Sequence, residues 1–299
     1  MRAPLPPYRG RFAPSPTGPL HFGSLVAALG SWLRARHSGG RWLIRIEDLD
    51  PPREVAGAAQ QQIATLAAFG MLSDEPVLWQ HDRHDAYAAA LQRLVEQDLA
   101  FACWCSRGDL QADDGLHRGA CIAAPDTRRM PAWRVRVPDE TIGFDDVLLG
   151  HQTQRLAAEV GDFVVRRVEG YFAYQLAVVV DDAAQGITEV VRGADLLDST
   201  PRQILLQRYL GLPTPRYLHL PLALDADGRK LSKQDRALPV QADDPLPALR
   251  RALEFLGLPA ARWRDIGAVA PLLRVATEAF DLQAIPRRGS IVHMRHGLP

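Results

Sequence analysis

Long apolar runs are missing from this chain of 299 residues. The longest, Tyr171 to Val180, has about half of the roughly 20 residues that a membrane helix needs. Met1 to Gly10 contains no apolar core of a signal peptide, so export is not expected. The three cysteines are an odd number, which argues against a disulfide framework. We therefore expect a cytoplasmic protein that does not bind a membrane.

Lysine is nearly absent. The chain has 35 basic and 35 acidic residues, and 33 of the basic residues are arginine. This balance gives no overall electrostatic signal for nucleic-acid binding. The two lysines, Lys230 and Lys233, lie in one pentapeptide, Lys230–Gln234, just after a predicted turn. Compact, rotatable ammonium groups suit a phosphate ligand, so this segment is a candidate phosphate-binding loop. The alternative is a pair of solvated surface lysines.

Strand and helix patterns alternate along the first part of the chain. A short strand from Gly10 ends at the prolines that begin with Pro14. A helix is predicted from Leu20 to Arg36 with Ser24 as its N-cap, and an apolar strand from Arg41 to Ile46. Such alternation is typical of an α/β fold with a parallel sheet and crossover helices. Further helices are predicted at Gly57–Phe69, His84–Gln97, Pro201–Leu210, Pro247–Leu256 and Ala268–Ala279, and further strands at Phe163–Arg167, Ile187–Arg192 and Tyr217–Leu224.

A glycine-bearing turn, Pro16 to Ser24, leads into the first predicted helix. Free backbone N–H groups and the positive end of the helix dipole suit the phosphates of a nucleotide. His21 can donate a hydrogen bond to a phosphate, and Gly23 allows a flat ring to approach the backbone closely. Taken alone, such turns are also common in purely structural roles.

Taken together, these motifs resemble those of a known family. His21–Ser24 and Lys230–Gln234 resemble the two signature motifs of class I aminoacyl-tRNA synthetases. The surrounding sequences RFAPSPTGPLHFGS and RWLIRIEDLD resemble the glutamyl branch of that class. The resemblance runs from about Arg9 to Gln234, with the motifs in the order of the family. Ser24 departs from the general signature, which ends in histidine.

The resemblance implies a Rossmann-like domain that binds ATP, with its Mg²⁺, and L-glutamate at the carboxyl ends of its strands. Glutamyl-adenylate would form without a covalent enzyme nucleophile. His21, Lys230 and Lys233 would be catalytic, by neutralising the triphosphate. The residues implied for ATP are His21, Gly23, Ser24, Lys230, Ser232 and Lys233. Those implied for glutamate are Arg11, Phe12, Ala13, Pro14, Ser15, Glu47, Tyr174 and Arg192.

Glutamate carries two carboxylates and one ammonium group, so its pocket needs guanidinium groups and an anion. Arg11 and Arg192 match the arginines of the family, Glu47 matches the ammonium partner, and Tyr174 matches a substrate-contacting hydroxyl. Which arginine binds which carboxylate is left open. The alternatives are surface ion pairs for the arginines and core packing for the tyrosine.

All three cysteines lie within residues 103–121. Cys103 and Cys105 form a C-x-C pair, and His117 and Cys121 follow four residues apart. A Cys₃His set is typical of a closed, structural zinc site, so we expect one structural Zn²⁺. His117 is the open position, because relatives carry tyrosine there and Asp113 or Asp114 could instead supply an oxygen ligand. The other alternative is buried free cysteines.

These patterns divide the chain into four parts: a first catalytic half at 1–99, an insertion with the zinc site at 100–155, a second catalytic half at 156–215, and the lysine loop with a helical region at 216–299. Only 65 residues follow Gln234, too few for an anticodon-binding domain beside the final helices. The chain thus resembles the short paralogues of glutamyl-tRNA synthetase that esterify glutamate to queuosine in tRNA(Asp).

RNA contact is expected from arginines of the insertion, namely Arg128, Arg129, Arg134 and Arg136. A solvated basic face explains these four equally well. Three other functions are weighed: a truncated synthetase that charges the 3′ end of a tRNA, a catalytically inactive RNA-binding paralogue, and a ligase that transfers glutamate to a small molecule or protein. A monomer is expected.

Overall fold

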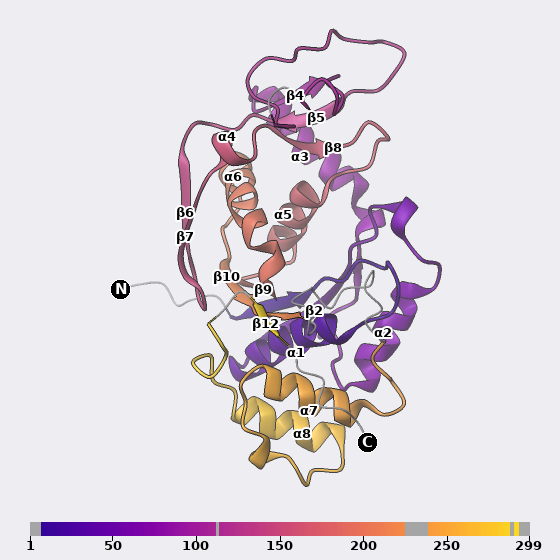
Figure 1. Cartoon of the computed structure of the whole chain (residues 1–299). Helices are drawn as coiled ribbons and strands as arrows, with labels where there is room; N and C mark the ends of the chain where they lie inside the picture. Colours follow the sequence, from indigo (N-terminus) through magenta and orange to yellow (C-terminus); the bar gives the residue numbers. More distant parts are fainter. Residues whose placement is uncertain (1–6, 112–113, 225–238, 288–289, 293–299) are drawn as a thin grey trace.

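The computed structural model describes residues 7–111, 114–224, 239–287 and 290–292 (Figure 1). The helices are α1 (Phe22–His37), α2 (Ala58–Ala68), α3 (His84–Glu96), α4 (Leu156–Glu159), α5 (Tyr174–Ala184), α6 (Thr200–Leu210), α7 (Pro245–Phe255) and α8 (Val269–Glu278). The strands are β1 (Arg9–Phe12), β2 (Arg41–Ile46), β3 (Leu78–Trp79), β4 (Ala100–Cys103), β5 (Ala132–Val135), β6 (Thr141–Asp146), β7 (Gly150–Arg155), β8 (Phe163–Arg166), β9 (Glu189–Gly193), β10 (Arg216–Leu220), β11 (Leu222–Leu224) and β12 (Ser290–Val292).

Parallel strands form the centre of the molecule. β1 pairs with β2, β2 with β3, and β10 with both β9 and β6, all in parallel. The two groups meet where Thr188 N–H donates to the Arg9 carbonyl at 2.9 Å. This arrangement confirms the predicted α/β fold class with a parallel sheet.

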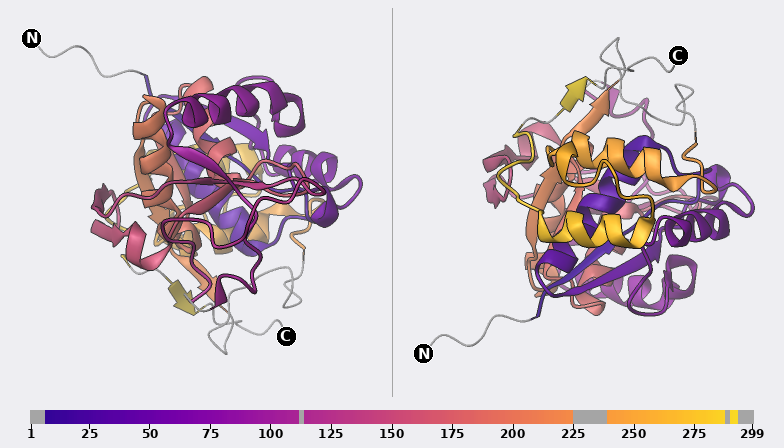
Figure 2. Two further views of the ribbon diagram at one scale, coloured as in Figure 1. Left: turned by 90° about the horizontal axis from the view of Figure 1, so that it is seen from above. Right: turned by 90° about the horizontal axis from the view of Figure 1, so that it is seen from below.

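Helices cover both faces of the parallel strands. On one face α1, α7 and α8 share a core that includes Leu29, Leu253 and Leu272. On the other face α3, α5 and α6 pack around Tyr87 and Leu176. Figure 1 shows the two layers on opposite sides of β2 and β9, and Figure 2 shows α7 and α8 side by side. Because both faces are covered, residues 42–46 of β2 are all buried, and four of these five residues are apolar.

The start of α1 differs from the prediction. The helix begins at Phe22, and its N-cap is His21, whose Nδ1 accepts the backbone N–H of Ser24 at 3.3 Å. The prediction of Ser24 as the N-cap is therefore wrong, because the imidazole satisfies the free N–H group that a capping hydroxyl would satisfy. A neutral His21 ring that accepts at Nδ1 carries its proton on Nε2.

The predicted strand Tyr217–Leu224 is two strands, β10 and β11, separated at Pro221. Proline lacks the N–H that would continue the ladder with β9. After Pro221 the chain pairs with β12 instead. The ladder of β9 and β10 ends with Leu220 opposite Gly193, at the same edge as the ends of β1 and β2.

A separate antiparallel sheet, β4-β5-β8, forms one end of the molecule, while α7 and α8 form the other (Figure 1). The hairpin of β6 and β7 extends beside α6, and its strand β6 joins β10. The antiparallel sheet contains strands from both sides of residue 155, and the division of the chain at that residue stays a prediction. Among the described residues, none of the helices combines the length and apolarity needed to cross a bilayer.

Candidate active site

A pocket of about 270 Å³ opens at the carboxyl ends of β1, β2, β9 and β10. This is the edge where parallel α/β sheets bind their ligands. Its walls include every described residue predicted to bind ATP or glutamate: Arg11, Phe12, Ala13, Pro14, Ser15, His21, Gly23, Ser24, Glu47, Tyr174 and Arg192. Lys230, Ser232 and Lys233 lie outside the described residues. The fold thus brings together groups that are up to 181 residues apart in the sequence, Arg11 to Arg192.

Among the lining residues that were not predicted, Gln62 and Asp195 carry polar groups of particular interest. Gln62 of α2 is fully buried, and its amide donates to the carbonyls of Ser15 and Gly18 at 3.1 and 2.7 Å. It therefore fixes the turn between β1 and α1. A lone glutamine inside a helix gives no sequence signal for this role. Asp195 also lines the pocket, and its place three residues after Arg192 was the only signal for it.

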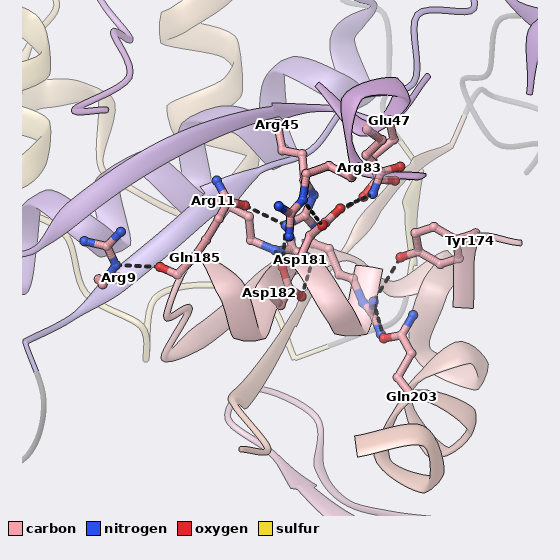
Figure 3. A network of polar contacts seen from close by, with 12 residues as sticks. Arg9, Arg11, Arg45, Glu47, Arg83, Tyr174, Asp181, Asp182, Gln185 and Gln203 are labelled. Atoms are coloured by element: carbon pink, nitrogen blue, oxygen red, sulfur yellow. Dashed lines mark hydrogen bonds and ion pairs between the residues drawn. The ribbon is translucent and has the colours of Figure 1, made fainter. Parts of the chain in front are cut away.

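Two arginines share one carboxylate below the pocket (Figure 3). Arg11 donates through Nε and Nη2 to Asp182 at 3.0 and 3.3 Å, and Arg45 donates through Nη1 to the same carboxylate at 2.8 Å. Burial alone would raise the pKa of Asp182, but Arg11 and Arg45 outweigh it and hold that pKa below its ordinary value. Asp182 is therefore ionised at neutral pH and anchors Arg11 at the pocket wall.

Glu47 follows β2 directly and faces the same network. Its Oε1 accepts Arg45 Nη2 at 3.3 Å, and no residue in the described part of the chain donates to its Oε2. Burial raises the pKa of Glu47, while Arg45 and Arg11 oppose that effect. A cation bound at Oε2 would compensate the buried charge. This position suits the ammonium group of an amino acid.

Arg192 and Tyr174 form a second polar group in the pocket. Arg192 Nη1 donates to the Tyr174 hydroxyl at 3.1 Å and to Gln203 Oε1 at 2.8 Å. Figure 3 labels Tyr174 and Gln203, which lie on the same side of the network. Because the tyrosine oxygen accepts from arginine, its own proton is available as a donor. No described residue accepts that proton, so Tyr174 presents a hydrogen-bond donor for a ligand carboxylate.

The chain enters and leaves the lysine-containing segment beside this pocket. On the N-terminal side, Leu222 and Ala223 of β11 line the pocket. On the C-terminal side, Pro239 forms an isolated bridge with His21, and Val240 N–H donates to the Leu20 carbonyl at 3.0 Å. Both described flanks of residues 225–238 are therefore next to the predicted phosphate-binding turn.

The Cys₃His set predicted from spacing comes together in space. The ligand atoms of Cys103, Cys105, His117 and Cys121 all lie within 4.8 Å of one another. A tetrahedral zinc with bonds of about 2.0–2.3 Å places its ligand atoms about 3.3–3.8 Å apart, so the set fits this ion with little movement. Of the alternatives, Asp114 is not in this group, and Asp113 lies outside the described residues.

His117 is oriented by the second half of the chain. Its Nδ1 lies 2.9 Å from Asp162 Oδ2, and its Nε2 lies 3.5 Å from Cys121 Sγ. A carboxylate behind a ligand imidazole is the usual outer partner of a zinc-binding histidine. Asp162 N–H also donates to the His117 carbonyl at 2.7 Å. Gly161, with φ of +67°, passes so close to that carbonyl that a Cβ would lie 2.4 Å from it.

The four arginines predicted to contact RNA have local partners. Arg134 donates to the Asp162 carbonyl at 2.7 Å, and Arg136 donates to the Asp98 carbonyl at 3.0 Å. Arg128 pairs with Asp126 and is 89% exposed, and Arg129 also reaches Asp126. Arg134 therefore supports the loop that holds His117, while Arg128 faces solvent. Their contact with RNA stays a prediction.

Comparison with known proteins defines the class of this chain. The family model described as "tRNA synthetases class I (E and Q), catalytic domain" matches residues 8–130 and 122–276. The chain belongs to this family of class I tRNA synthetases, as the sequence motifs predicted. It is a ligase of the glutamyl-tRNA synthetase type, and its glutamate-tRNA ligase class agrees with the charged groups gathered in the pocket.

Individual proteins of known name match this chain over nearly its full length. A protein of Xanthomonas campestris pv. campestris (strain 8004) named "Glutamyl-Q tRNA(Asp) synthetase" is 60% identical over 286 residues, covering 95% of both chains. One of the same name from Burkholderia cenocepacia (strain ATCC BAA-245 / DSM 16553 / LMG 16656 / NCTC 13227 / J2315 / CF5610) is 56% identical over 298 residues, covering 95% of this chain and 99% of the other.

Among solved structures, a glutamate-tRNA synthetase from Elizabethkingia anophelis is similar with a TM-score of 0.80 and 25% identity. The match covers 97% of this chain and 68% of that one. A glutamate tRNA ligase from Elizabethkingia meningosepticum in complex with its amino acid gives 0.79 and 25%, covering 95% and 66%. This chain therefore spans about two thirds of the length of these synthetases.

Proposed function

We propose that this protein activates L-glutamate with ATP and transfers it to the queuosine of tRNA(Asp). The observation that carries the proposal is that Arg11, Glu47, Tyr174 and Arg192 line the same pocket as the start of α1. The names of the relatives at 56–60% identity support the acceptor. The pocket supplies the chemistry that an amino acid with two carboxylates and a nucleotide both require.

Glutamate matches the charges of the pocket wall. Arg11 uses Nε and Nη2 for Asp182, which leaves its Nη1 for a ligand carboxylate. Glu47 Oε2 receives the ammonium group. Tyr174 donates its hydroxyl proton to the other carboxylate beside Arg192. Every charge of the substrate then has a partner within a buried site, where unpaired charges would be costly.

The nucleotide would lie against the start of α1. His21 uses Nδ1 for Ser24 N–H, so its Nε2–H can donate to a phosphate oxygen. Gly23 lets the adenosine approach the backbone. By sequence, Lys230, Ser232 and Lys233 complete the ATP site, with Lys233 as the main phosphate ligand. Mg²⁺ would accompany the triphosphate and neutralise part of its charge.

In the first step, the α-carboxylate of glutamate attacks the α-phosphorus, and the bond to the bridging oxygen of pyrophosphate breaks. In the second step, a hydroxyl of the queuosine cyclopentenediol attacks the carbonyl carbon and AMP leaves. The chain positions the reactants and stabilises charge on the phosphates, with no covalent bond to the protein.

Zinc is proposed as a structural ion held by Cys103, Cys105, His117 and Cys121. With all four positions filled by protein, it would stabilise the fold of residues 100–135 and take no part in the reaction. A cytoplasmic monomer is proposed for the whole protein, in a compartment that supplies ATP and tRNA and keeps its three cysteines reduced.

Two assays test this function. ATP–pyrophosphate exchange should depend on glutamate, and an inactive RNA-binding paralogue would show no exchange. Radiolabelled glutamate should then attach to tRNA(Asp) that contains queuosine and not to the same tRNA with guanosine in its place. A truncated synthetase would instead attach glutamate to the 3′ end of the tRNA that contains guanosine. Periodate cleavage of the 3′ terminal ribose before the reaction would then abolish that product.

A further inference from the structure

Arg192 is held by acceptors on every side. Its Nε donates to His219 Nε2 at 3.0 Å, and Nη2 donates to the Leu196 carbonyl and to Thr200 Oγ1 at 3.2 and 2.8 Å. Together with the two contacts of Nη1 described above, these bonds engage each nitrogen of the guanidinium group. Its orientation therefore depends on the hydrogen-bonding state of each neighbour, and His219 is the neighbour whose role is set by the position of a ring proton.

His219 has one hydrogen-bonding state that fits. Arginine cannot accept a hydrogen bond, so His219 Nε2 must carry a lone pair and Nδ1 must carry the proton. Nδ1 lies 2.7 Å from Asp146 Oδ2, and both side chains are fully buried. Burial lowers the pKa of His219, which favours the neutral ring; its bond to Asp146 opposes that effect and Arg192 adds to it.

Asp146 is fixed in turn by the backbone. Its Oδ1 accepts the N–H groups of Leu148 and Leu149 at 3.0 and 2.8 Å. Its Oδ2 accepts the backbone N–H of His219 at 3.1 Å as well as the ring proton. Both oxygens therefore face only donors. The carboxylate comes from the last residue of β6, in the hairpin that precedes the second catalytic half.

We propose that Asp146 and His219 are positioning residues that orient Arg192, and through it the Tyr174 hydroxyl, for a carboxylate of glutamate. This inference rests on the proposed function, since it names the support of the same glutamate site. Asp146, His219 and Arg192 form one series of hydrogen bonds from the hairpin to the pocket wall, in which Arg192 donates to His219 and His219 donates to Asp146. The series reaches the substrate only through Arg192 and Tyr174.

The substitution Asp146→Asn tests the direction of this series. Because Oδ1 faces two backbone N–H groups, the amide oxygen must take that position. The NH₂ group then faces the His219 ring, and the backbone N–H of His219 loses its acceptor. The ring would then accept at Nδ1 and carry its proton on Nε2. That proton would turn toward Thr200 Oγ1, 3.3 Å from Nε2, and Arg192 Nε–H, 3.0 Å away, would lose its acceptor. A reversed tautomer of this kind is what impairs a catalytic Asp–His pair when its aspartate becomes asparagine.

The expected result has two parts. ¹⁵N NMR of imidazole-labelled protein should show His219 with its proton on Nδ1 in the wild type and on Nε2 in Asp146→Asn. The KM for glutamate in pyrophosphate exchange should rise about 10- to 100-fold, the range expected when a buried polar group loses its partner. The KM for ATP should stay within about twofold. A general loss of folded protein would lower the maximal rate and change neither KM, so the rise in the KM for glutamate alone marks the positioning role.

The chain offers a matched control. Asp145, the neighbouring residue on β6, makes a similar contact with His151 at 2.8 Å, but these side chains are 87% and 66% exposed. Asp145→Asn should leave both KM values unchanged. If Asp146→Asn does not fold, His219→Leu and His219→Gln decide instead. Glutamine keeps an acceptor for Arg192 and leucine does not, so the KM for glutamate should be lower in His219→Gln than in His219→Leu.

The outcomes separate the two proposals. Arg192→Gln should raise the KM for glutamate, and an unchanged value would remove Arg192 from the proposed glutamate site. If Arg192→Gln has its effect but the reversed tautomer in Asp146→Asn leaves the KM for glutamate unchanged, the positioning role is refuted while the site stands. A wild-type His219 with its proton on Nε2 would also overturn the inference.

Discussion

Asp182→Asn is the perturbation whose cost follows most directly from the structure. The carboxylate is shared by Arg11 and Arg45, and Arg45 is completely buried. An asparagine oxygen at Oδ1 could still accept from both guanidinium groups, but its NH₂ group would face Arg11 Nη2, and one negative charge would be lost. Removing one partner from a buried ion pair typically costs about 3–5 kcal/mol.

The measurement is urea unfolding followed by tryptophan fluorescence. Asp139→Asn is the control, because Asp139 also makes a bidentate pair, with Arg155, but these side chains are 67% and 59% exposed. An exposed pair contributes about 0–1 kcal/mol. The free energy of unfolding should therefore fall by about 3–5 kcal/mol in Asp182→Asn and far less in the control. Equal losses would refute the view that burial makes the shared carboxylate important.

Four further outcomes are expected. Glu47→Gln should raise the KM for glutamate about 10- to 100-fold, as expected for losing one charge-assisted hydrogen bond, and a wild-type KM would exclude Glu47 as the ammonium partner. Lys233→Ala should abolish most pyrophosphate exchange; normal exchange would contradict its role as phosphate ligand. Purified protein should contain about one equivalent of zinc, and a chelator should lower the Tm. Protein without zinc whose Tm does not respond to the chelator would contradict the zinc site. Since the pKa of Asp182 is lowered on folding, its contribution is present at neutral pH and should be lost as the pH falls below about 4; Asp182→Asn should lack that part of the acid titration of stability.

Elements with a strong local signal were predictable from the sequence. The strand Arg41–Ile46 was predicted with its observed ends, because the apolar run is bounded by glycine and by acidic residues. The grouping of the Cys₃His set was also predicted, since its four residues are close in the sequence. The N-cap of α1 was not predicted. Serine, threonine, aspartate and asparagine are the preferred N-cap residues, whereas here the imidazole of His21 accepts the free backbone N–H.

The supporting residues of the site could not be predicted, because their partners are chosen by the fold. Asp182 meets Arg11 across 171 positions, and Asp146 meets His219 across 73. Each looks like an ordinary polar residue in its own segment. The pairing of β6 with β10 brings Asp146 to His219, and the fold places Asp182 of α5 against Arg11 of β1. No periodic pattern encodes which buried charge will pair with which.

The contact of Gly161 and Asp162 with His117 has a consequence for synthesis on the ribosome. The three cysteines emerge first, but Asp162, whose carboxylate contacts the His117 imidazole, follows Cys121 by 41 residues. At about 5–20 residues per second, this interval lasts about 2–8 s. In the proposed zinc site, the thiolates could therefore bind the ion during this interval, and the imidazole would take its final orientation only after Asp162 has been synthesised.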